Sequence, residues 1–227
     1  MTGGDNLSVR LASSLVLAPL ALAAAWVGGA VFVIVWAGAA LIIGWEWIKL
    51  VAPARDAMSW RIAGLVYAAV AFIAPMLLRA DAEHGFAALV FLFAIVWMTD
   101  IMGYAVGRAI GGAKLWPAVS PNKTRSGAMG GLAGALAAGI VIAASLSLAV
   151  LPIAILSVIL SMVAQAGDLF ESAIKRRFGA KDTSHLIPGH GGLMDRLDGF
   201  ITAALAAALI GVVRGGFSAA ATGLLVW

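Results

Sequence analysis

Charged side chains are concentrated in one segment of an otherwise apolar chain. Ten of the chain's 26 charged residues (15 Lys and Arg, 11 Asp and Glu) lie between positions 168 and 198, in 31 of 227 positions. Two of the three histidines lie there as well. Carboxylates combined with fixed cations are the components of metal-assisted reactions on phosphate groups. The density therefore indicates a site and not a solvated loop.

The carboxylates lie at helical spacings. Asp168 shares one helical face with Glu171, Ser172 and Lys175, and Asp195 shares another with Asp198. Facing carboxylates repel each other unless a cation lies between them or a proton is shared. In a chain without cysteine, oxygen ligands favour a hard ion such as Mg²⁺. Zinc is not expected, because the histidines lack the spacing of a zinc pair.

Basic residues surround these carboxylates in the sequence and suit a polyphosphate substrate. They are Lys175, Arg176, Arg177, Lys181 and Arg196, with Lys114, Lys123 and Arg125 from a second polar segment, Asp100–Gly127. The glycine-rich turn at 188–192 could cradle phosphate with its backbone N–H groups. Membrane topology alone accounts for many lone basic residues, but it does not account for the carboxylates. Whether Glu46, Asp100 and His84 are functional or structural stays open.

The rest of the chain must position these segments, and its composition indicates a membrane protein. Mean hydropathy is +1.02, and 63% of the residues are hydrophobic while 11% are charged. Apolar stretches of about 20 residues, enough to cross a ~30 Å hydrocarbon core as a helix, recur throughout. We predict an all-α polytopic membrane protein with one domain over residues 1–227. About eight transmembrane helices are expected, at 9–27, 29–47, 60–78, 85–104, 128–149, 151–167, 198–213 and 216–227.

The basic residues also predict the orientation. With the N-terminus inside, loops near 48–60, 105–127 and 168–197 face the cytoplasm. Of the 15 Lys and Arg residues, only Arg79 and Arg214 then lie outside, as the positive-inside rule requires. Both polar segments would thus form an active site at the cytoplasmic ends of the helices, in a bacterial-type inner membrane. The sequence pI near 9.9 fits loops that face anionic lipid, and no nucleic-acid partner is expected.

Small residues recur at fourth-residue spacing within the apolar stretches. Gly103, Gly107 and Gly111 form one such series, and Gly127 with Gly131 begins another. This spacing lets helix backbones approach closely in a membrane. It therefore predicts tight helix packing next to the second polar segment.

The segment Ser172–Asp198 resembles the signature of the phosphatidate cytidylyltransferases, or CDP-diacylglycerol synthases. The pattern is S-x-I-K-R-x4-K-D-x-S-x2-I-P-x-H-G-G-L-x-D-R-L-D, and every defined position is filled. The segment Asp100–Thr124 is similar to the family too, with D-x2-G-Y-x2-G-R at its start and S-P-x-K-T at its end. One departure is Arg125-Ser126, where the family usually has an acidic residue before the glycine.

The resemblance implies transfer of the cytidylyl group of CTP to phosphatidic acid, giving CDP-diacylglycerol and pyrophosphate. It also implies a homodimer, and Mg²⁺ at Asp168 and Asp195, with or without a second cation. Asp198 is expected to support this metal site. The residues expected to hold phosphates are Lys175, Arg176, Lys181 and Arg196. The residues expected to position the substrates are Ser172 and His190. Further substrate contacts are expected from Asn122, Lys123, Thr124, Asp182, Gly191 and Gly192.

Two alternatives stay open. A CTP-dependent kinase of the polyprenol or phytol type would pass the γ-phosphoryl group to a lipid alcohol. That reaction needs a general base, for which Asp182 or His190 would serve. A non-catalytic transporter or scaffold is the other alternative, but a transporter should carry ionisable residues near the bilayer midplane. Here they cluster at one edge of the membrane.

Overall fold

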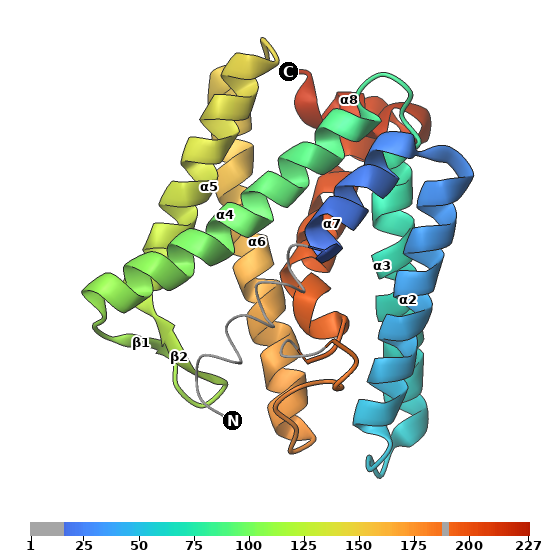
Figure 1. The fold of residues 1–227 in the computed structure, drawn as a ribbon, viewed down its shortest axis with the longest axis vertical. Coiled ribbons are helices and arrows are strands. Elements are labelled where there is room, and N and C mark those ends of the chain that lie inside the picture. The colour runs from blue at the N-terminus through green and yellow to red at the C-terminus, as the bar shows by residue number, and fades with distance from the viewer. Residues whose placement is uncertain (1–15, 188–190) are drawn as a thin grey trace. The chain divides into compact units, whose positions relative to one another are not determined.

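The computed structural model describes residues 16–187 and 191–227, most of them in helices (Figure 1). Within that part of the chain, six helices are long and apolar enough to cross a membrane. This confirms the all-α polytopic membrane architecture. After a shorter helix, Val16–Val27, the long helices are α2 Gly29–Val51, α3 Ala57–Arg79, α4 Gly85–Ile110, α5 Arg125–Ser145, α6 Val150–Arg177 and α7 Met194–Gly215.

All six long helices extend beyond the spans that hydrophobicity predicts, and α4, α6 and α7 gain the most residues. α4 extends to Ile110, α6 to Arg177, and α7 already begins at Met194. Hydropathy marks the part of a helix that lies in hydrocarbon, whereas backbone hydrogen bonding can continue into the headgroup region. As a result, most of the polar residues singled out above lie on helix ends and not in loops.

The two terminal spans differ from the prediction in other ways. The predicted span 9–27 begins outside the described residues. The predicted span 216–227 is a 3₁₀ turn, η1 Phe217–Ala219, followed by the six-residue helix α8 Ala220–Leu225. At 1.5 Å per residue α8 is about 9 Å long, too short to cross a bilayer.

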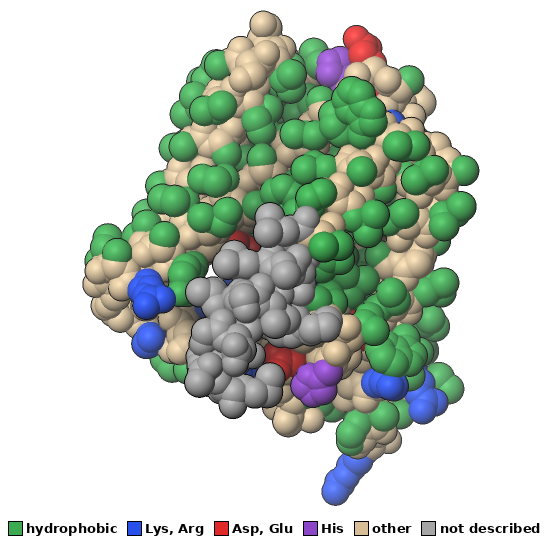
Figure 2. Space-filling model, viewed as in Figure 1, with side chains coloured by type: hydrophobic (Ala, Val, Ile, Leu, Met, Phe, Trp, Pro, Cys, Tyr) green, Lys and Arg blue, Asp and Glu red, His purple; other side chains and the backbone are tan. Residues whose placement is uncertain are grey.

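The described chain forms two compact units. The first contains residues 16–73, 174–187 and 191–197. In it, two tryptophans of α2 donate their indole N–H groups to α3: Trp36 to the carbonyl of Ala71 at 2.9 Å, and Trp47 to that of Trp60 at 2.8 Å. Hydrophobic side chains cover the visible face of α2 (Figure 2), as a helix in contact with lipid requires.

The second unit contains residues 74–173 and 198–227, and its α4 and α5 cross closely. A Cβ atom on Gly127 would lie 2.6 Å from the carbonyl oxygen of Gly103 and 3.2 Å from Cα of Gly107. The glycine spacing therefore serves helix packing, as predicted. Between these helices the chain forms an antiparallel hairpin, β1 Lys114–Trp116 and β2 Ser120–Thr124, where the sequence predicted only a loop.

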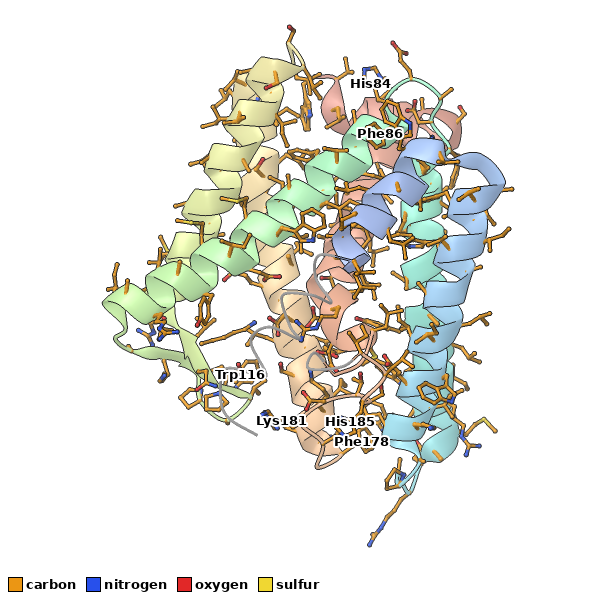
Figure 3. The ribbon with its side chains drawn as sticks, in the orientation of Figure 1. His84, Phe86, Trp116, Phe178, Lys181 and His185 are labelled. Carbon is orange, nitrogen blue, oxygen red and sulfur yellow. The ribbon has the colours of Figure 1, made fainter. Side chains whose placement is uncertain are left out.

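The C-terminal segment of the second unit is pinned to the turn between α3 and α4. Asp81 accepts hydrogen bonds from the backbone N–H groups of Thr222, Glu83 and His84. Burial alone would raise the pKa of Asp81, but these hydrogen bonds outweigh it and hold the pKa below its ordinary value. A second contact joins Nδ1 of His84 and Oγ1 of Thr222 at 3.0 Å. Figure 3 shows His84 at the start of α4. His84 thus has a structural role at this end of the unit.

Candidate active site

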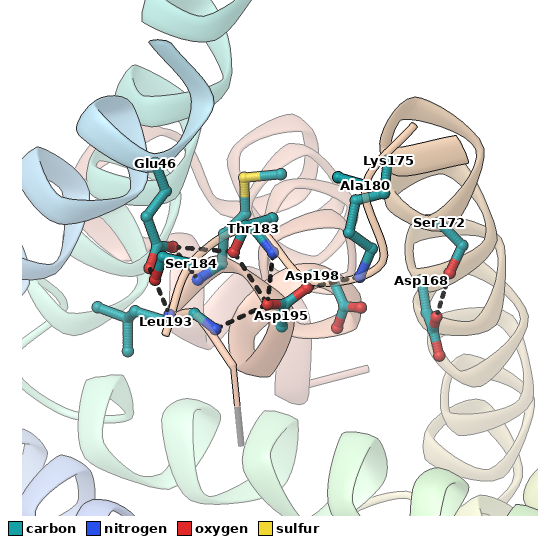
Figure 4. Close-up of polar contacts among 12 residues, drawn as sticks. Glu46, Asp168, Ser172, Lys175, Ala180, Thr183, Ser184, Leu193, Asp195 and Asp198 are labelled. Atoms are coloured by element: carbon teal, nitrogen blue, oxygen red, sulfur yellow. Dashed lines mark hydrogen bonds and ion pairs between the residues drawn. The ribbon is translucent and has the colours of Figure 1, made fainter. Parts of the chain in front are cut away.

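The signature segment of the first unit is built around a buried ion pair. Lys175, near the end of α6, donates from Nζ to Oδ1 of Asp195 on α7 at 2.5 Å. Their side chains are 11% and 3% exposed. Oδ2 of Asp195 accepts from the backbone N–H and the hydroxyl of Thr183, both at 2.9 Å, and from the N–H of Gly192 at 2.7 Å (Figure 4). A buried carboxylate needs such full pairing, and here it ties both ends of the loop together.

Glu46, near the end of α2, holds the same loop from the other side and is fully buried. Its Oε1 accepts from the hydroxyl of Ser184 at 2.6 Å and from the N–H of Leu193 at 2.9 Å. Its Oε2 accepts from the N–H of Met194, the first residue of α7, at 2.7 Å (Figure 4). The first N–H groups of a helix have no partner within the helix, and an anion there also meets the favourable end of the helix dipole. Glu46 therefore caps α7.

The two glycines of the signature fit closely against these carboxylates. A Cβ atom on Gly192 would lie 2.0 Å from Oγ1 of Thr183 and 2.5 Å from Oε1 of Glu46. A Cβ atom on Gly191, whose φ is +86°, would lie 2.8 Å from Oδ2 of Asp195. Glycine is therefore needed at both positions to let the loop close over the carboxylates. The sequence predicted that the N–H of Gly192 could bind phosphate, but in the structure this N–H donates to Asp195.

The cations of this segment are placed differently from its carboxylates. Arg176, Lys181 and Arg196 are exposed, and Arg176 donates to the carbonyl of Ala180 at 3.2 Å. Asp182 is also exposed. Figure 3 shows Lys181 in the loop that follows α6. His190 lies outside the described residues. The buried acids thus shape the loop, while three of its four predicted phosphate-binding cations face outward.

The second unit contains a cleft of about 540 Å³. Its lining combines two acidic and two basic side chains with polar and aromatic ones from α4, the hairpin and α6. Those used below are Asp100, Tyr104, Arg108, Asn122, Lys123 and Asp168.

Within this cleft Lys123, on β2, forms an ion pair with Oδ2 of Asp168, on α6. The two side chains are 30% and 28% exposed. Ser172, one turn further along α6, donates to Oδ1 of Asp168 at 3.4 Å (Figure 4). Thr124 accepts from the N–H of Gly127 at 3.0 Å and so caps α5. Lys123, Thr124 and Asn122 are thereby held at the start of α5, as one group with Asp168.

Asp198, at the start of α7 in this unit, lies within electrostatic reach of three other carboxylates, Asp168, Glu171 and Asp100. Such like charges repel one another unless a cation or a shared proton intervenes. Asp168 and Asp198 thus belong to one acidic group, which also includes Asp100 and Glu171. Metal binding by Asp168 and Asp198 stays a prediction.

Sequence reasoning missed three parts of this arrangement. Glu46 was left open because nothing near it in the sequence links it to a loop 137 residues away. Thr183 occupies an undefined position of the signature, yet it contacts both buried acids. Arg108 belongs to the family-like segment but received no role. Of these three residues, only Glu46 could have been found from the sequence, because a lone Glu near the end of an apolar span is costly unless it is paired.

Similarity to known proteins extends over nearly the whole chain. Residues 57–213 match the model of a family described as the cytidylyltransferase family. A phosphatidate cytidylyltransferase of Brucella abortus (biovar 1, strain 9-941) is 38% identical over 258 aligned positions, which cover 92% of this chain and 94% of that protein. A phosphatidate cytidylyltransferase of Staphylococcus saprophyticus is 42% identical over 139 positions, which cover 60% of this chain and 52% of that protein.

Proposed function

Because the chain belongs to the cytidylyltransferase family, we propose that it transfers the cytidylyl group of CTP to phosphatidic acid. The products are CDP-diacylglycerol, a precursor in phospholipid biosynthesis, and pyrophosphate. The observation that carries this proposal is the 38% identity to the Brucella abortus phosphatidate cytidylyltransferase over 94% of that protein's length. The six apolar helices make the enzyme an integral membrane protein, which suits a substrate with two acyl chains.

The chemistry needs charge neutralisation more than it needs a base. An oxygen of the lipid phosphate forms a bond to the α-phosphorus of CTP, and the bond from that phosphorus to the bridging oxygen of pyrophosphate breaks. The attacking phosphate is already an anion, so no proton has to be removed from it. Both substrates are strongly negative, and fixed cations reduce their repulsion and stabilise the leaving pyrophosphate. Arg176, Lys181 and Arg196 are exposed cations suited to that role.

Mg²⁺ forms part of this proposal, and the acids of the second unit have the oxygen donors that it prefers. The mutual repulsion around Asp198 is what a bound cation would relieve. Among the described residues no three Asp, Glu or His side chains form a complete metal site. We propose that Asp168 and Asp198 hold the ion, with water and substrate oxygens as further ligands. When bound, the ion would neutralise charge on the phosphates.

Asp195 has a different environment from these two acids. Its oxygens accept four hydrogen bonds, from Lys175, Gly192 and twice from Thr183. Binding a metal would require the carboxylate to release at least one of these donors. Metal binding by Asp195 stays a prediction, and its observed contacts support a role in holding the loop.

The orientation of the chain is a further part of the proposal. The distribution of Lys and Arg supports a hairpin that faces the cytoplasm. A bacterial-type inner membrane and a homodimer are also proposed, the dimer on the family resemblance alone. Because the chain contains no cysteine, single cysteines report on sidedness without background. In intact cells, a membrane-impermeant maleimide should label Glu83→Cys and leave Ala118→Cys, in the hairpin turn, unlabelled. The reverse pattern would overturn the orientation.

The activity can be tested with CTP labelled separately at the α- and γ-phosphates. Purified protein, Mg²⁺ and phosphatidic acid should move the α label into lipid and release the γ label as pyrophosphate. If a lipid alcohol instead takes up the γ label, the chain is a CTP-dependent lipid kinase. If neither label moves although CTP binds, the proposal is wrong and a non-catalytic role has to be considered.

A further inference from the structure

The rim of the cleft is formed by one face of α4, near the helix's C-terminal end. Tyr104 and Arg108 line the cleft, and Arg108 donates to the Tyr104 hydroxyl at 2.7 Å. We propose that Arg108 binds the phosphate monoester of the lipid substrate, and that the lipid reaches the cleft from the bilayer along this face of α4. This inference rests on the proposed function and assigns one of its substrates to a specific residue.

The charges in the cleft leave Arg108 available to an anion. The cations that line it in the described chain are Lys123 and Arg108, and Lys123 is paired with Asp168. Arg108 is exposed, and its described polar partner is a neutral phenol. A guanidinium has five N–H donors in a planar fork that matches two phosphate oxygens at once. The tyrosine contact restricts the side chain while leaving donors of the guanidinium for a phosphate.

The surface beside Arg108 has the properties of a path for acyl chains. Ile101 lies three positions before Tyr104, and Tyr104 lies four positions before Arg108, so the three residues share one helical face. Ile101 and Tyr104 are 58% and 67% exposed. On a membrane-spanning helix such apolar exposure faces lipid. α4 has 26 residues, or about 39 Å, so its last turn reaches the headgroup level, where arginine places its charge in polar surroundings.

The same geometry favours lipid over nucleotide as the source of the phosphate. A nucleotide enters from water and has no hydrocarbon to cover Ile101. A phospholipid has its phosphate at the level of the last turn of a spanning helix and its chains alongside the preceding turns. A basic residue in the last turn also interacts favourably with the helix dipole. The interaction with the helix dipole does not require Arg108 to contact a substrate. Substrate kinetics can therefore distinguish this stabilising role from phosphate binding.

The test compares Arg108→Gln with Arg55→Gln, which removes the same charge from an exposed residue that does not line the cleft. KM for dioleoyl phosphatidic acid and KM for CTP are measured in mixed micelles. We expect Arg108→Gln to raise KM for phosphatidic acid about tenfold or more, which is the loss of one charge-assisted phosphate contact of about 1.5–3 kcal/mol. KM for CTP should stay within about twofold, and Arg55→Gln should resemble the wild type. Arg108→Lys, a point charge without the fork, should lie between Arg108→Gln and the wild type.

Two results would overturn the inference. An increase in KM for CTP alone would assign Arg108 to the nucleotide, and unchanged KM values for both substrates would leave it no role in binding. Lipid binding without CTP separates this inference from the proposed function. Native mass spectrometry should show dioleoyl phosphatidic acid, but not phosphatidylcholine, retained by the wild type and lost from Arg108→Gln, whether or not cytidylyl transfer occurs. Equal retention by both proteins would refute the inference even if the enzyme is active.

Discussion

Replacing Glu46 by glutamine tests whether a buried acid on α2 holds the signature loop. Glutamine has nearly the same shape, but its amide group has one oxygen and one NH₂ group. The N–H of Leu193 is bound to Oε1 and the N–H of Met194 to Oε2. Whichever oxygen is replaced, one of these backbone donors faces an NH₂ group that cannot accept a hydrogen bond.

The cost follows from these contacts. One buried donor without an acceptor costs about 1–3 kcal/mol, and loss of the negative charge at the start of α7 costs about 0.3–1 kcal/mol more. The total is roughly 1–4 kcal/mol. For a protein of this size each kcal/mol lowers the melting temperature by about 2–4 °C. We therefore expect Glu46→Gln to melt about 3–15 °C below the wild type in the same detergent.

Thermal unfolding and hydrogen exchange together make the test specific. Faster exchange of the amides of Leu193 and Met194 should accompany the lower melting temperature, since their acceptor is weakened or lost. Glu83→Gln is the matched control, because the Glu83 side chain is 79% exposed and should show neither effect. A Glu46→Gln protein with wild-type melting and wild-type exchange at these two amides would refute the assignment of Glu46 as the cap of α7.

Three further predictions concern the second unit. Because the pKa of Asp81 is lowered in the folded protein, its stabilising effect is complete at neutral pH and is lost as the pH falls below about 4. Asp81→Asn should therefore melt below the wild type at pH 7. Its melting temperature should also fall less than that of the wild type when the solution is acidified. Gly127→Ala should cost about 1–3 kcal/mol or more because its Cβ meets the carbonyl of Gly103, whereas Gly38→Ala, with nothing within 4 Å, should be tolerated in the same melting assay. Asp168→Asn should lower cytidylyl transfer about 100-fold or more while the protein still elutes and melts as a folded species; wild-type turnover would exclude Asp168 from the reaction.

The membrane architecture was predictable because hydrophobic length is a local property. Each long helix of the structure contains most of a predicted span. Gly103, Gly107, Gly127 and Gly131 lie where α4 packs against α5, whereas Gly111 lies just beyond the end of α4 and has no atom within 4 Å of its Cβ position. The errors lie where hydropathy stops being informative. It cannot show that α6 continues through Lys175, or that the last apolar stretch folds as the short helix α8.

The candidate site was predictable only in part, for a different reason. Helical spacing indicated which acids share a face, but it did not indicate which donors each acid would meet. Glu46 meets its donors across more than 130 positions of sequence, and the hairpin that carries Lys123 depends on pairing between Lys114 and Thr124. Contacts of this kind follow from tertiary packing, so no local pattern in the sequence predicts them.

The contacts divide the acids of the signature region into two kinds, and this division explains why so much charge is concentrated in an apolar chain. Glu46 and Asp195 are buried, and their oxygens accept hydrogen bonds from loop hydroxyls, backbone N–H groups and one lysine. Asp168 is about one-quarter exposed, faces a cleft, and lies within reach of the charge of Asp198. An acid of the first kind maintains the shape of a loop that presents exposed cations to phosphates. An acid of the second kind faces a cleft beside other carboxylates, and although Asp168 pairs with Lys123, a cation or a proton that arrives with the substrate would further reduce the repulsion within this group.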